Sequence, residues 1–299
     1  MDIRHLEYFL AIVDHGGFNR AATALYVSQP SLSQAVRALE RDLGTDLFHR
    51  IGRRAILTEA GHALIGPARE AVRSLRTARS SVEAVHELRT GRLDVACMPS
   101  QAVEPLTTLI RAFSERHPGV SVAIRAAFTS REVIDMVRTG AAELGLLASA
   151  GPVSEKEVAR YDLGRQRFVL LVPPDSPLSG RTTVNSEELA GRRLIVGQLG
   201  TGMRAYVDAL REQGVAFTVA AETEHRVALL PLVLGGVGVA VVTESWRDIA
   251  RQAGAHVLDI EPATTLDIAL VSRHGSVSPA ATAFVRIAAG TGADGSATD

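Results

Sequence analysis

The sequence has a single cysteine, a single lysine and few aromatic residues among its 299 positions. One cysteine, Cys97, excludes an intramolecular disulfide and every metal cluster that needs several cysteines. Because Cys97 stands in the apolar stretch DVACMP, we expect a packed and inert thiol, with a redox-sensing thiol as the alternative. The N-terminus is amphipathic and charged, and it lacks both the apolar run of a signal peptide and a membrane-spanning stretch. We therefore expect a cytoplasmic protein without a membrane partner.

The common signatures of catalysis are also missing. The segment GGVGVA at 235–240 lacks the third glycine of a dinucleotide loop and precedes an expected strand instead of following one. The segment GQLGTG at 197–202 resembles a phosphate loop, yet no Gly-Lys-Ser/Thr follows, and Lys156 is the only lysine. No hydrolase nucleophile elbow or HExxH helix occurs, and the nine histidines are scattered without metal-ligand spacing. The sequence therefore predicts no enzyme, no cofactor and no metal.

The first sixty residues have the pattern of three short helices followed by a hairpin. Apolar residues recur at helical spacing between Ile3 and Val13, and Gly16–Gly17 ends that helix. A second short helix follows, for which Asn19 can act as the cap. After the third helix we expect two short strands around a turn at Ile51–Gly52–Arg53. This hairpin would form a wing beside the third helix.

The third helix is predicted to have two different faces. It begins near Pro30, whose missing N–H would have no partner in a first helical turn, and Ser28 or Gln29 provides the cap. The expected buried stripe consists of Leu32, Val36, Leu39 and Leu43. The other face then carries, near the N-terminus, Ser31, Ser33, Gln34 and Arg37. Side chains of these types at the start of such a helix read base edges in the major groove of DNA.

Arginines gather in the expected wing. Arg50, Arg53 and Arg54 fall within five residues beside His49, which makes a compact basic patch suited to phosphate contacts. A solvated loop is the alternative interpretation. The net charge of the chain, −1, gives no indication of nucleic-acid binding by itself.

A long helix is predicted after Thr58, which would cap it. Its apolar or small residues alternate in spacing between four and three: Leu64, Ala68, Ala71, Leu75, Ala78, Val82 and Val85. Such a strict heptad predicts a coiled-coil seam with a second helix. Packing of the helix on its own domain is the alternative. Pro67 is expected to kink the helix early, because it removes one backbone hydrogen bond.

From residue 91 onward short strands alternate with helices, which predicts α/β layers with a largely parallel sheet. The length fits two lobes. The first would span about 91–161 and receive a returning strand and helix at about 265–290, and the second would span about 162–264.

A ligand site is expected between these lobes. Ligands of open α/β sheets bind at the carboxyl ends of strands, beside helix N-termini whose free N–H groups attract anions. That rule selects Ser100, Gln101, Thr129, Ser130, Gln198, Thr201 and Gly202, with Thr223 and His225 as less central additions. For Thr129, Ser130 and Thr223, a role as helix caps alone is the alternative. Since the set offers hydroxyls, amides and helix ends, we expect a small polar effector, an organic anion.

The stretch FNRAATALYVSQPSLSQAVRALERDLGTDLFHRIGRRAILTEAG, residues 18–61, closely resembles the winged helix-turn-helix of LysR-type transcriptional regulators. The resemblance continues along nearly the whole chain. It implies an α/β protein overall, with a DNA-binding domain at 1–58, a linker dimerisation helix at 59–90 and a two-lobed effector-binding domain at 91–299, similar to type 2 periplasmic binding proteins. Asn19 stands where the family often has Ser or Thr, and Gln34 where Arg is frequent, so exact base preference is not carried over.

The resemblance also implies partners and a mechanism. Recognition-helix side chains Gln29, Pro30, Ser31, Ser33, Gln34 and Arg37 would approach a dyad-symmetric operator in double-stranded DNA, and the wing arginines would hold its backbone or minor groove. The family assembles as homodimers and homotetramers, and RNA polymerase is a further partner to consider. Effector binding would change the angle between the lobes and so the spacing of dimers. The rival interpretation is a small-molecule-binding protein or enzyme on the two-lobed fold, whose N-terminal helices serve oligomerisation.

Overall fold

In the computed structural model, the described residues are 2–51, 54–84, 91–151, 156–275 and 277–293. Contacts between residues divide the chain into two compact units. The N-terminal unit contains residues 1–87 with 139–141, and the C-terminal unit contains residues 88–138 with 142–299. Each unit is considered by itself below.

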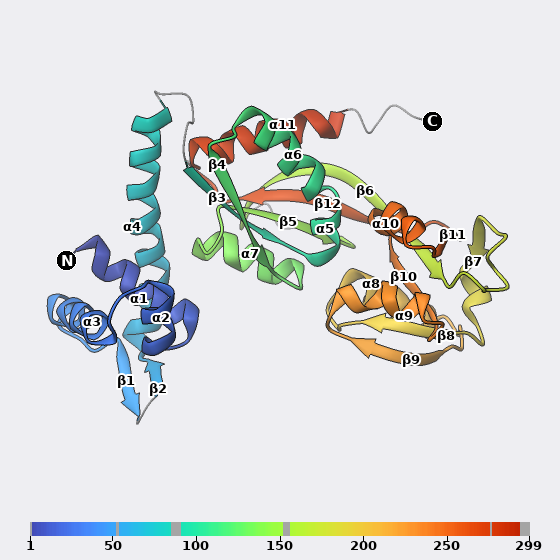
Figure 1. The fold of residues 1–299 in the computed structure, drawn as a ribbon, viewed down its shortest axis with the longest axis horizontal. Coiled ribbons are helices and arrows are strands. Elements are labelled where there is room, and N and C mark those ends of the chain that lie inside the picture. Colours follow the sequence, from blue (N-terminus) through green and yellow to red (C-terminus); the bar gives the residue numbers. More distant parts are fainter. Residues whose placement is uncertain (1, 52–53, 85–90, 152–155, 276, 294–299) are drawn as a thin grey trace. The chain divides into compact units, whose positions relative to one another are not determined.

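The N-terminal unit has the helices and the hairpin that the sequence predicts (Figure 1). Its elements are α1 (Ile3–His15), α2 (Phe18–Ala24), α3 (Gln29–Leu43), β1 (Phe48–Ile51), β2 (Arg54–Leu57) and α4 (Glu59–Ala84). The two strands pair in antiparallel register, with Ile51 opposite Arg54, which confirms the predicted hairpin.

The ends of these helices follow local chemistry. Gly16 ends α1 in the left-handed conformation, with φ of 65°, a region that glycine enters without steric cost. The Ser28 hydroxyl accepts from the backbone N–H of Ser31 and so caps α3 as expected. The proposed cap of α2 is wrong: the cap position is Gly17, because the helix already begins at Phe18 and Asn19 is its second residue.

An aromatic and aliphatic core holds the three short helices together. Phe9 on α1 and Leu39 on α3 are fully buried, and the Phe48 ring lies 5.6 Å from the Phe9 ring between centroids. The prediction that Leu43 completes the buried stripe of α3 is wrong, since this side chain is 39% exposed. It is the last residue of the helix, and the final turn projects past the packed core.

The C-terminal unit is built on a sheet of ten described strands (Figure 1). These are β3 (Gly91–Cys97), β4 (Val120–Ala126), β5 (Leu144–Ser149), β6 (Ala159–Val172), β7 (Thr183–Asn185), β8 (Arg193–Gly197), β9 (Thr218–Thr223), β10 (Val239–Thr243), β11 (His256–Glu261) and β12 (Thr265–Ser272). The main order is β4-β3-β5-β12-β6-β10-β8-β9, and β11 pairs with both β6 and β7.

Strand directions differ between the two ends and the centre of this sheet. The pairs β3–β4, β3–β5, β8–β9 and β8–β10 are parallel, as predicted. At the centre, however, β12 runs antiparallel to β5 and β6, and β6 runs antiparallel to β10. The central pairs are antiparallel because β6 and β12 are the strands by which the chain passes from one lobe to the other.

Strand β6 belongs to both lobes. Its first part, Ala159–Arg167, pairs with β12 in the first lobe, and its last part, Phe168–Val172, pairs with β10 and β11 in the second. The hydrophobic run predicts only the second part, because the first part is largely polar and partly exposed.

Helices cover both faces of the first lobe's sheet (Figure 1). They are α5 (Pro99–Val103), α6 (Leu106–Arg116), α7 (Ser130–Thr139) and α11 (Pro279–Ala293). Alternate residues of β3 face opposite sides: Val95 packs in the core that includes Phe113 of α6 and Phe284 of α11, whereas Ala96 packs with Val133 of α7. The last strand, β12, pairs with β5, and Phe284 of the last helix packs in the same core.

The second lobe carries α8 (Gly202–Glu212), α9 (Leu229–Leu234) and α10 (Arg247–Gln252), with one-turn helices at Arg226–Ala228 and Glu244–Trp246. No helix in the described part of the chain combines the length and the apolar character that crossing a membrane requires.

Candidate functional sites

The first candidate site is the exposed face at the start of α3. Gln29, Ser31, Gln34 and Arg37 are exposed and Ser33 is partly exposed, so the helix presents the predicted side chains together. The Gln29 amide donates a hydrogen bond of 2.9 Å to the Ser33 hydroxyl, one helical turn later. This bond uses one N–H of the Gln29 amide, so the second N–H and the amide oxygen can still pair with a base edge.

The remaining predicted residue of this face, Pro30, is also exposed and occupies the first turn of α3. The hydroxyl oxygens of Ser28 and Ser31 lie 2.7 Å apart. Ser31 thus contributes to the capped helix end as well as to the exposed face, which fits a role in positioning the helix on phosphates more than in reading bases.

Two further exposed residues, one shortly before α3 and one on it, were not predicted as site residues. Tyr26 is 97% exposed and has a left-handed backbone, with φ of 54°, at the end of α2. No local pattern predicts a left-handed backbone at a tyrosine, because this conformation favours glycine or asparagine. Arg41 lines an open hollow together with Arg37, one helical turn away, and that spacing could have identified it. The same hollow contains the carboxylates Glu40 and Asp46.

The wing arginines are placed only in part. Arg50 lies in β1 and Arg54 in β2, where they face Ala55 and Ile51 respectively across the hairpin. Arg53 and the side chains of Arg50 and Arg54 lie outside the described residues. Their contact with phosphates therefore stays a prediction.

The predicted seam of α4 divides into two parts. Ala68 is 1% exposed and belongs to the core of the N-terminal unit, and Leu64 and Ala71 pack partly buried against that core. Leu75 is partly exposed, and the side chains of Ala78 and Val82 and the whole of Val85 lie outside the described residues. The first half of α4 therefore packs on its own unit, which is the alternative that the sequence analysis left open. A coiled-coil seam from Leu75 onward stays a prediction.

An ion pair supports this packing. The Arg69 guanidinium of α4 lies 2.5 Å from the Asp14 carboxylate of α1. The helix continues through Pro67, whose ring is exposed.

The second candidate site lies where the two lobes of the C-terminal unit meet. Ser100 of α5, 4% exposed, belongs to the first lobe. Its hydroxyl oxygen accepts hydrogen bonds from Arg226 Nη1 at 2.9 Å and from Trp246 Nε1 at 3.4 Å, both of the second lobe. Arg226 also donates to Met203 Sδ at 3.2 Å. Ser100, a predicted site residue of the first lobe, thus accepts hydrogen bonds from two side chains of the second lobe. Of these two, Arg226 was not predicted.

Gln101, the next predicted residue, is 1% exposed. Its amide nitrogen donates to Gln166 Oε1 at 3.4 Å, and Gln166 in turn donates to the carbonyl oxygen of Glu104. The Oε1 atom of Gln101 is buried and has no donor among the described residues. An unmatched buried acceptor is costly, so a donor supplied from outside the chain would stabilise it.

The hydroxyls at the start of α7 are occupied by local bonds. Thr129 Oγ1 accepts from the backbone N–H of Glu132, and Ser130 Oγ donates to the carbonyl oxygen of Ala148 at 2.7 Å. Thr129 lies against the second lobe, since a Cβ placed on Gly200 would be 3.4 Å from its methyl carbon. The structure therefore supports the capping role of Thr129 and places it at the junction of the lobes.

The predicted hydroxyl of the second lobe, that of Thr201, is likewise used in local hydrogen bonds. Thr201 caps α8 by accepting from Arg204 N–H, and its hydroxyl donates to the carbonyl oxygen of Gln198. Gly202 approaches Leu266 so closely that a Cβ would lie 2.9 Å from that side chain. Leu266 is the second residue of β12, the strand that returns to the first lobe.

Thr223 and His225 form a local turn beside Arg226. The Thr223 hydroxyl oxygen accepts from the backbone N–H of His225 at 3.0 Å, and the His225 residue is exposed. Their hydrogen bonds hold the short segment from which Arg226 extends. The predicted pair therefore holds the turn that precedes Arg226, and its own role in effector binding stays a prediction.

The thiol of Cys97 is buried in β3 and donates to the carbonyl oxygen of Met98. Burial raises the pKa of this thiol to about 12. The expected packed thiol is confirmed. No group of three or more His, Cys, Asp or Glu side chains with metal-binding geometry occurs among the residues that the structure describes.

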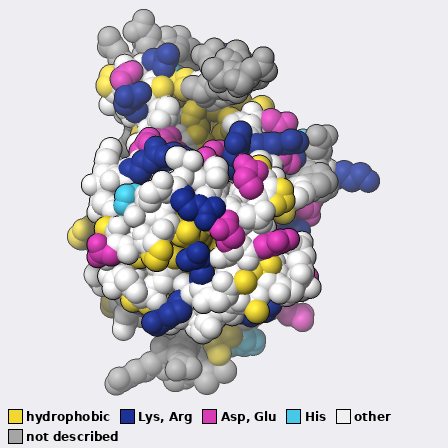
Figure 2. Space-filling view, turned by 90° about the vertical axis from the view of Figure 1, so that its right-hand side faces the viewer, with side chains coloured by type: hydrophobic (Ala, Val, Ile, Leu, Met, Phe, Trp, Pro, Cys, Tyr) yellow, Lys and Arg dark blue, Asp and Glu magenta, His cyan; other side chains and the backbone are white. Residues whose placement is uncertain are grey.

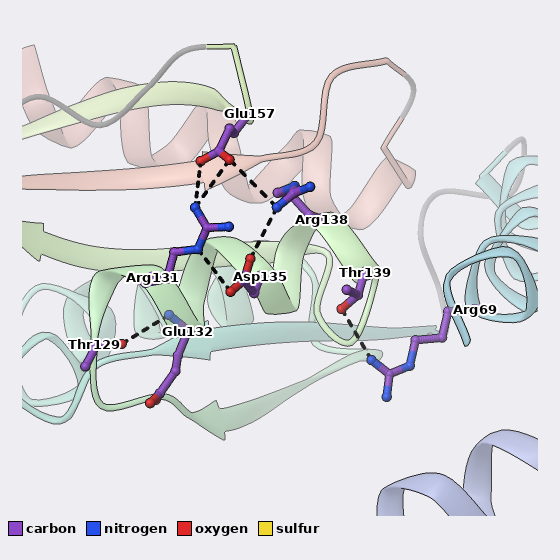
Figure 3. A network of polar contacts seen from close by, with 8 residues as sticks. All are labelled: Arg69, Thr129, Arg131, Glu132, Asp135, Arg138, Thr139 and Glu157. Atoms are coloured by element: carbon purple, nitrogen blue, oxygen red, sulfur yellow. Dashed lines mark hydrogen bonds and ion pairs between the residues drawn. The ribbon is translucent and has the colours of Figure 1, made fainter. Parts of the chain in front are cut away.

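A charge network lies on the exposed side of α7, and Figure 3 draws it together with the predicted residue Thr129, which bonds to Glu132. Arg131 pairs with Asp135 and Glu157, and Arg138 reaches the same two carboxylates. These side chains are well exposed, so each pair contributes little to stability. Figure 2 shows a face of the molecule on which basic and acidic side chains are similarly interspersed, so a phosphate backbone laid there would also meet carboxylates.

Two family models match the chain. One, described as a bacterial regulatory helix-turn-helix protein of the lysR family, matches residues 3–62. The other, described as the LysR substrate binding domain, matches residues 86–292.

Curated relatives and solved structures are similar along most of the chain. The RuBisCO operon transcriptional regulator of Allochromatium vinosum is 29% identical over 300 residues, which cover 95% of this chain and 94% of that protein. A probable hydrogen peroxide-inducible genes activator of Mycobacterium avium is 31% identical over 246 residues, which cover 81% of this chain and 78% of that protein. Full-length CbnR in complex with its target DNA has a TM-score of 0.70 at 24% identity, covering 97% of this chain and 100% of that one. The predicted fold class is confirmed.

Proposed function

The chain belongs to the LysR family of DNA-binding transcriptional regulators with an effector-binding domain, and from this we propose how its own residues carry out that function. We propose that α3 enters the major groove of duplex DNA and that the exposed side chains at its start make the sequence-dependent contacts. The observation that carries this proposal is the joint exposure of Gln29, Gln34 and Arg37 on one face of a capped, core-packed helix. A glutamine amide matches adenine and a guanidinium matches guanine.

The wing supplies affinity in this proposal. Arg50, Arg53 and Arg54 would neutralise phosphates, and Arg41 would extend the basic surface of Arg37 along α3. Contacts of this kind release counterions and make binding salt-dependent, without choosing a sequence.

One copy reads a single half-site, so we propose a homodimer on a dyad-symmetric operator, with homotetramers formed from two dimers. The pairing region is the part of α4 from Leu75 onward, because the earlier heptad positions are already used by the core of the N-terminal unit. We propose that the chain acts in the cytoplasm, on DNA, and that it carries out no catalytic step.

The effector is proposed to be a small organic molecule bound between the two lobes. The junction combines buried polar side chains of both lobes, Ser100 and Gln101 from the first and Thr201 from the second. The relative from Mycobacterium avium is named a probable activator of hydrogen peroxide-inducible genes, but a peroxide-sensing thiol needs access and a lowered pKa. Cys97 has neither, so we propose a bound effector rather than an oxidised cysteine as the signal.

The test of the DNA contacts compares two substitutions in the full chain. Arg37→Ala is expected to reduce discrimination between a genomic fragment and random duplex by about 10-fold to 100-fold. Arg53→Ala is expected to weaken binding to both DNAs equally and to reduce the slope of log affinity against log salt by about 1.

A matched control removes an exposed arginine from the C-terminal unit, Arg193→Ala, which has the same change in net charge. It is expected to leave affinity, discrimination and salt slope unchanged. If both N-terminal variants behave like this control, α3 and the wing do not hold the DNA and the proposed arrangement is wrong.

A further inference from the structure

Two glutamines on the exposed face of α3 differ in their surroundings. Gln29 donates a hydrogen bond of 2.9 Å from Nε2 to the hydroxyl oxygen of Ser33, four residues later. Four residues after Gln34 the chain has Ala38, and no hydrogen-bond partner of the Gln34 side chain occurs within the described part of the chain. Side chains four residues apart lie on the same face of a helix, so the residue type at that neighbouring position explains the difference.

The bond to Ser33 determines which groups the Gln29 amide still offers to a ligand. A free glutamine amide has two N–H donors and one carbonyl oxygen. Because one N–H of Gln29 points to Ser33, the exposed remainder is one N–H donor and one acceptor oxygen. Gln34 offers both donors and the oxygen. The two glutamines of this helix are therefore not equivalent as base readers.

Adenine and guanine differ in the pattern that each presents in the major groove. Adenine presents the acceptor N7 beside the N6 amino donor, whereas guanine presents two acceptors, N7 and O6. One N–H beside one oxygen matches adenine at both atoms. Against guanine the amide oxygen would face an acceptor, and the N–H that could take its place is already used by the bond to Ser33. This bond thus disfavours guanine more than adenine.

We propose that Ser33 is a positioning residue that makes Gln29 select adenine over guanine. This inference rests on the proposed function, in which α3 lies in the major groove, and it adds the residue that sets the choice at one base pair. Ser33 acts through Gln29 and contacts no base itself. Its own hydroxyl proton is left for a phosphate oxygen, so one side chain holds both the amide and the DNA backbone.

The role of this bond is separate from folding. Gln29 is exposed and Ser33 is partly exposed, so water competes for both groups in the free protein. The helix is held by its other face, where Leu32 and Val36 are buried in the core of the N-terminal unit. In the groove, water is partly displaced, and a broken bond to Ser33 would leave an N–H without a partner. A substitution of Ser33 should therefore alter base choice without loss of stability.

The experiment measures base preference with the full-length protein. A library of duplexes with randomised positions is bound, and the bound fraction is sequenced to obtain the preference at each base pair. The pair read by Gln29 is the one at which Gln29→Ala removes the preference, and the pair read by Gln34 is found in the same way with Gln34→Ala. Fluorescence polarisation then gives the Kd for two duplexes that differ only by adenine or guanine at the pair read by Gln29.

The unmodified chain is expected to prefer adenine at the pair read by Gln29, by about 10-fold or more. Ser33→Ala should reduce this preference about 3-fold to 10-fold, because the released N–H lets the amide donate to both acceptors of guanine. The preference at the pair read by Gln34 should stay unchanged. Ser33→Thr retains a hydroxyl and should retain the preference. In a chain that already carries Gln29→Ala, Ser33→Ala should have no further effect at this pair.

The matched control Ser31→Ala removes the other serine hydroxyl of this exposed face, which lies beside Ser28 instead of Gln29. Because we assign that hydroxyl to phosphates, the variant should weaken binding to both duplexes by the same factor and leave the adenine preference as it is. Melting temperatures separate the positioning role from a structural one. Ser33→Ala should not melt earlier than the unmodified chain, since alanine is the better helix former.

Three results would overturn the proposal: an unchanged adenine preference in Ser33→Ala, a preference for guanine at the pair read by Gln29, or a further change at this pair when Ser33→Ala is added to Gln29→Ala. Absence of any base pair that depends on Gln29 would overturn it as well. Failure of the proposed function gives a different result, because the unmodified chain would then select no sequence from the library.

Discussion

The guanidinium of Arg226 and the hydroxyl oxygen of Ser100 are joined by a hydrogen bond of 2.9 Å that runs from one lobe of the C-terminal unit to the other. The same oxygen accepts from the indole of Trp246. One serine in the first lobe thus accepts hydrogen bonds from two side chains of the second. Removal of this oxygen takes an acceptor from both of them.

This arrangement predicts the effect of Ser100→Ala on stability. The substitution leaves Arg226 Nη1 with only a weak sulfur acceptor and leaves Trp246 Nε1 without a partner, so the free energy of unfolding should fall by about 1–3 kcal/mol. Urea unfolding followed by Trp246 emission measures it. Ser114→Ala, at an exposed position of α6, is the control and should change the midpoint little. Equal midpoints for both variants would mean that the interlobe bonds contribute nothing.

The proposed pairing of α4 helices predicts the result of Leu75→Glu. A carboxylate at a seam position would be desolvated against the partner helix, so the dimer should dissociate to monomers and operator affinity should fall with it. Sedimentation velocity measures the assembly. Ser74→Glu introduces the same charge at the adjacent, exposed position and should leave the dimer intact. If Leu75→Glu sediments as the unmodified chain does, the pairing region lies elsewhere.

Two residues that follow helices have a left-handed backbone conformation, and substitutions at them are expected to change stability in opposite directions. Tyr26 holds a φ of 54° after α2, a conformation that costs a side chain about 1 kcal/mol or more, so Tyr26→Gly should stabilise the N-terminal unit by about 0.5–1 kcal/mol. Gly44 holds a φ of 69° after α3 with open space around it, so Gly44→Ala should destabilise the unit by about 1 kcal/mol. Thermal unfolding followed by circular dichroism measures both. A loss of stability in Tyr26→Gly would show that the exposed ring has a packing role.

Burial of Cys97 predicts an unreactive thiol. Because its pKa is raised from the ordinary 9.0 to about 12, the folded chain keeps the proton that the unfolded chain releases, and stability should fall as pH rises between about 9 and 12. At neutral pH the native protein should resist alkylation by iodoacetamide, whereas urea-unfolded protein should react fully. Mass spectrometry after a timed exposure measures the modification. Rapid labelling of the native chain, or a loss of DNA binding after peroxide treatment, would contradict this view.

Sequence patterns predicted the N-terminal unit almost completely, because its helices are specified locally. The stop at Gly16, the cap at Ser28 and the apolar spacing of Leu32, Val36 and Leu39 each depend on neighbouring residues alone. The cap of α2 was misplaced by two residues, because two glycines precede the helix and local preference favoured Asn19.

In the C-terminal unit, sequence patterns predicted the order of most strands and helices but not their long-range consequences. The polar first half of β6 is a strand only because β12, a hundred residues later, pairs with it. Arg226 was missed for the same reason: its significance lies in the approach to Ser100, 126 positions away, which no local pattern records. The packing of the first half of α4 on its own unit likewise depends on Ala68 meeting helices distant in sequence. The heptad pattern alone did not distinguish this half from the proposed pairing region.

The most direct test of the central claim, that paired N-terminal units read a DNA sequence through α3, is one ratio of affinities. Fluorescence polarisation at physiological salt compares the full chain on its strongest genomic fragment with a random duplex of equal length. We expect a preference of at least about 1,000-fold for the genomic fragment. Equal affinity for the two duplexes would contradict it.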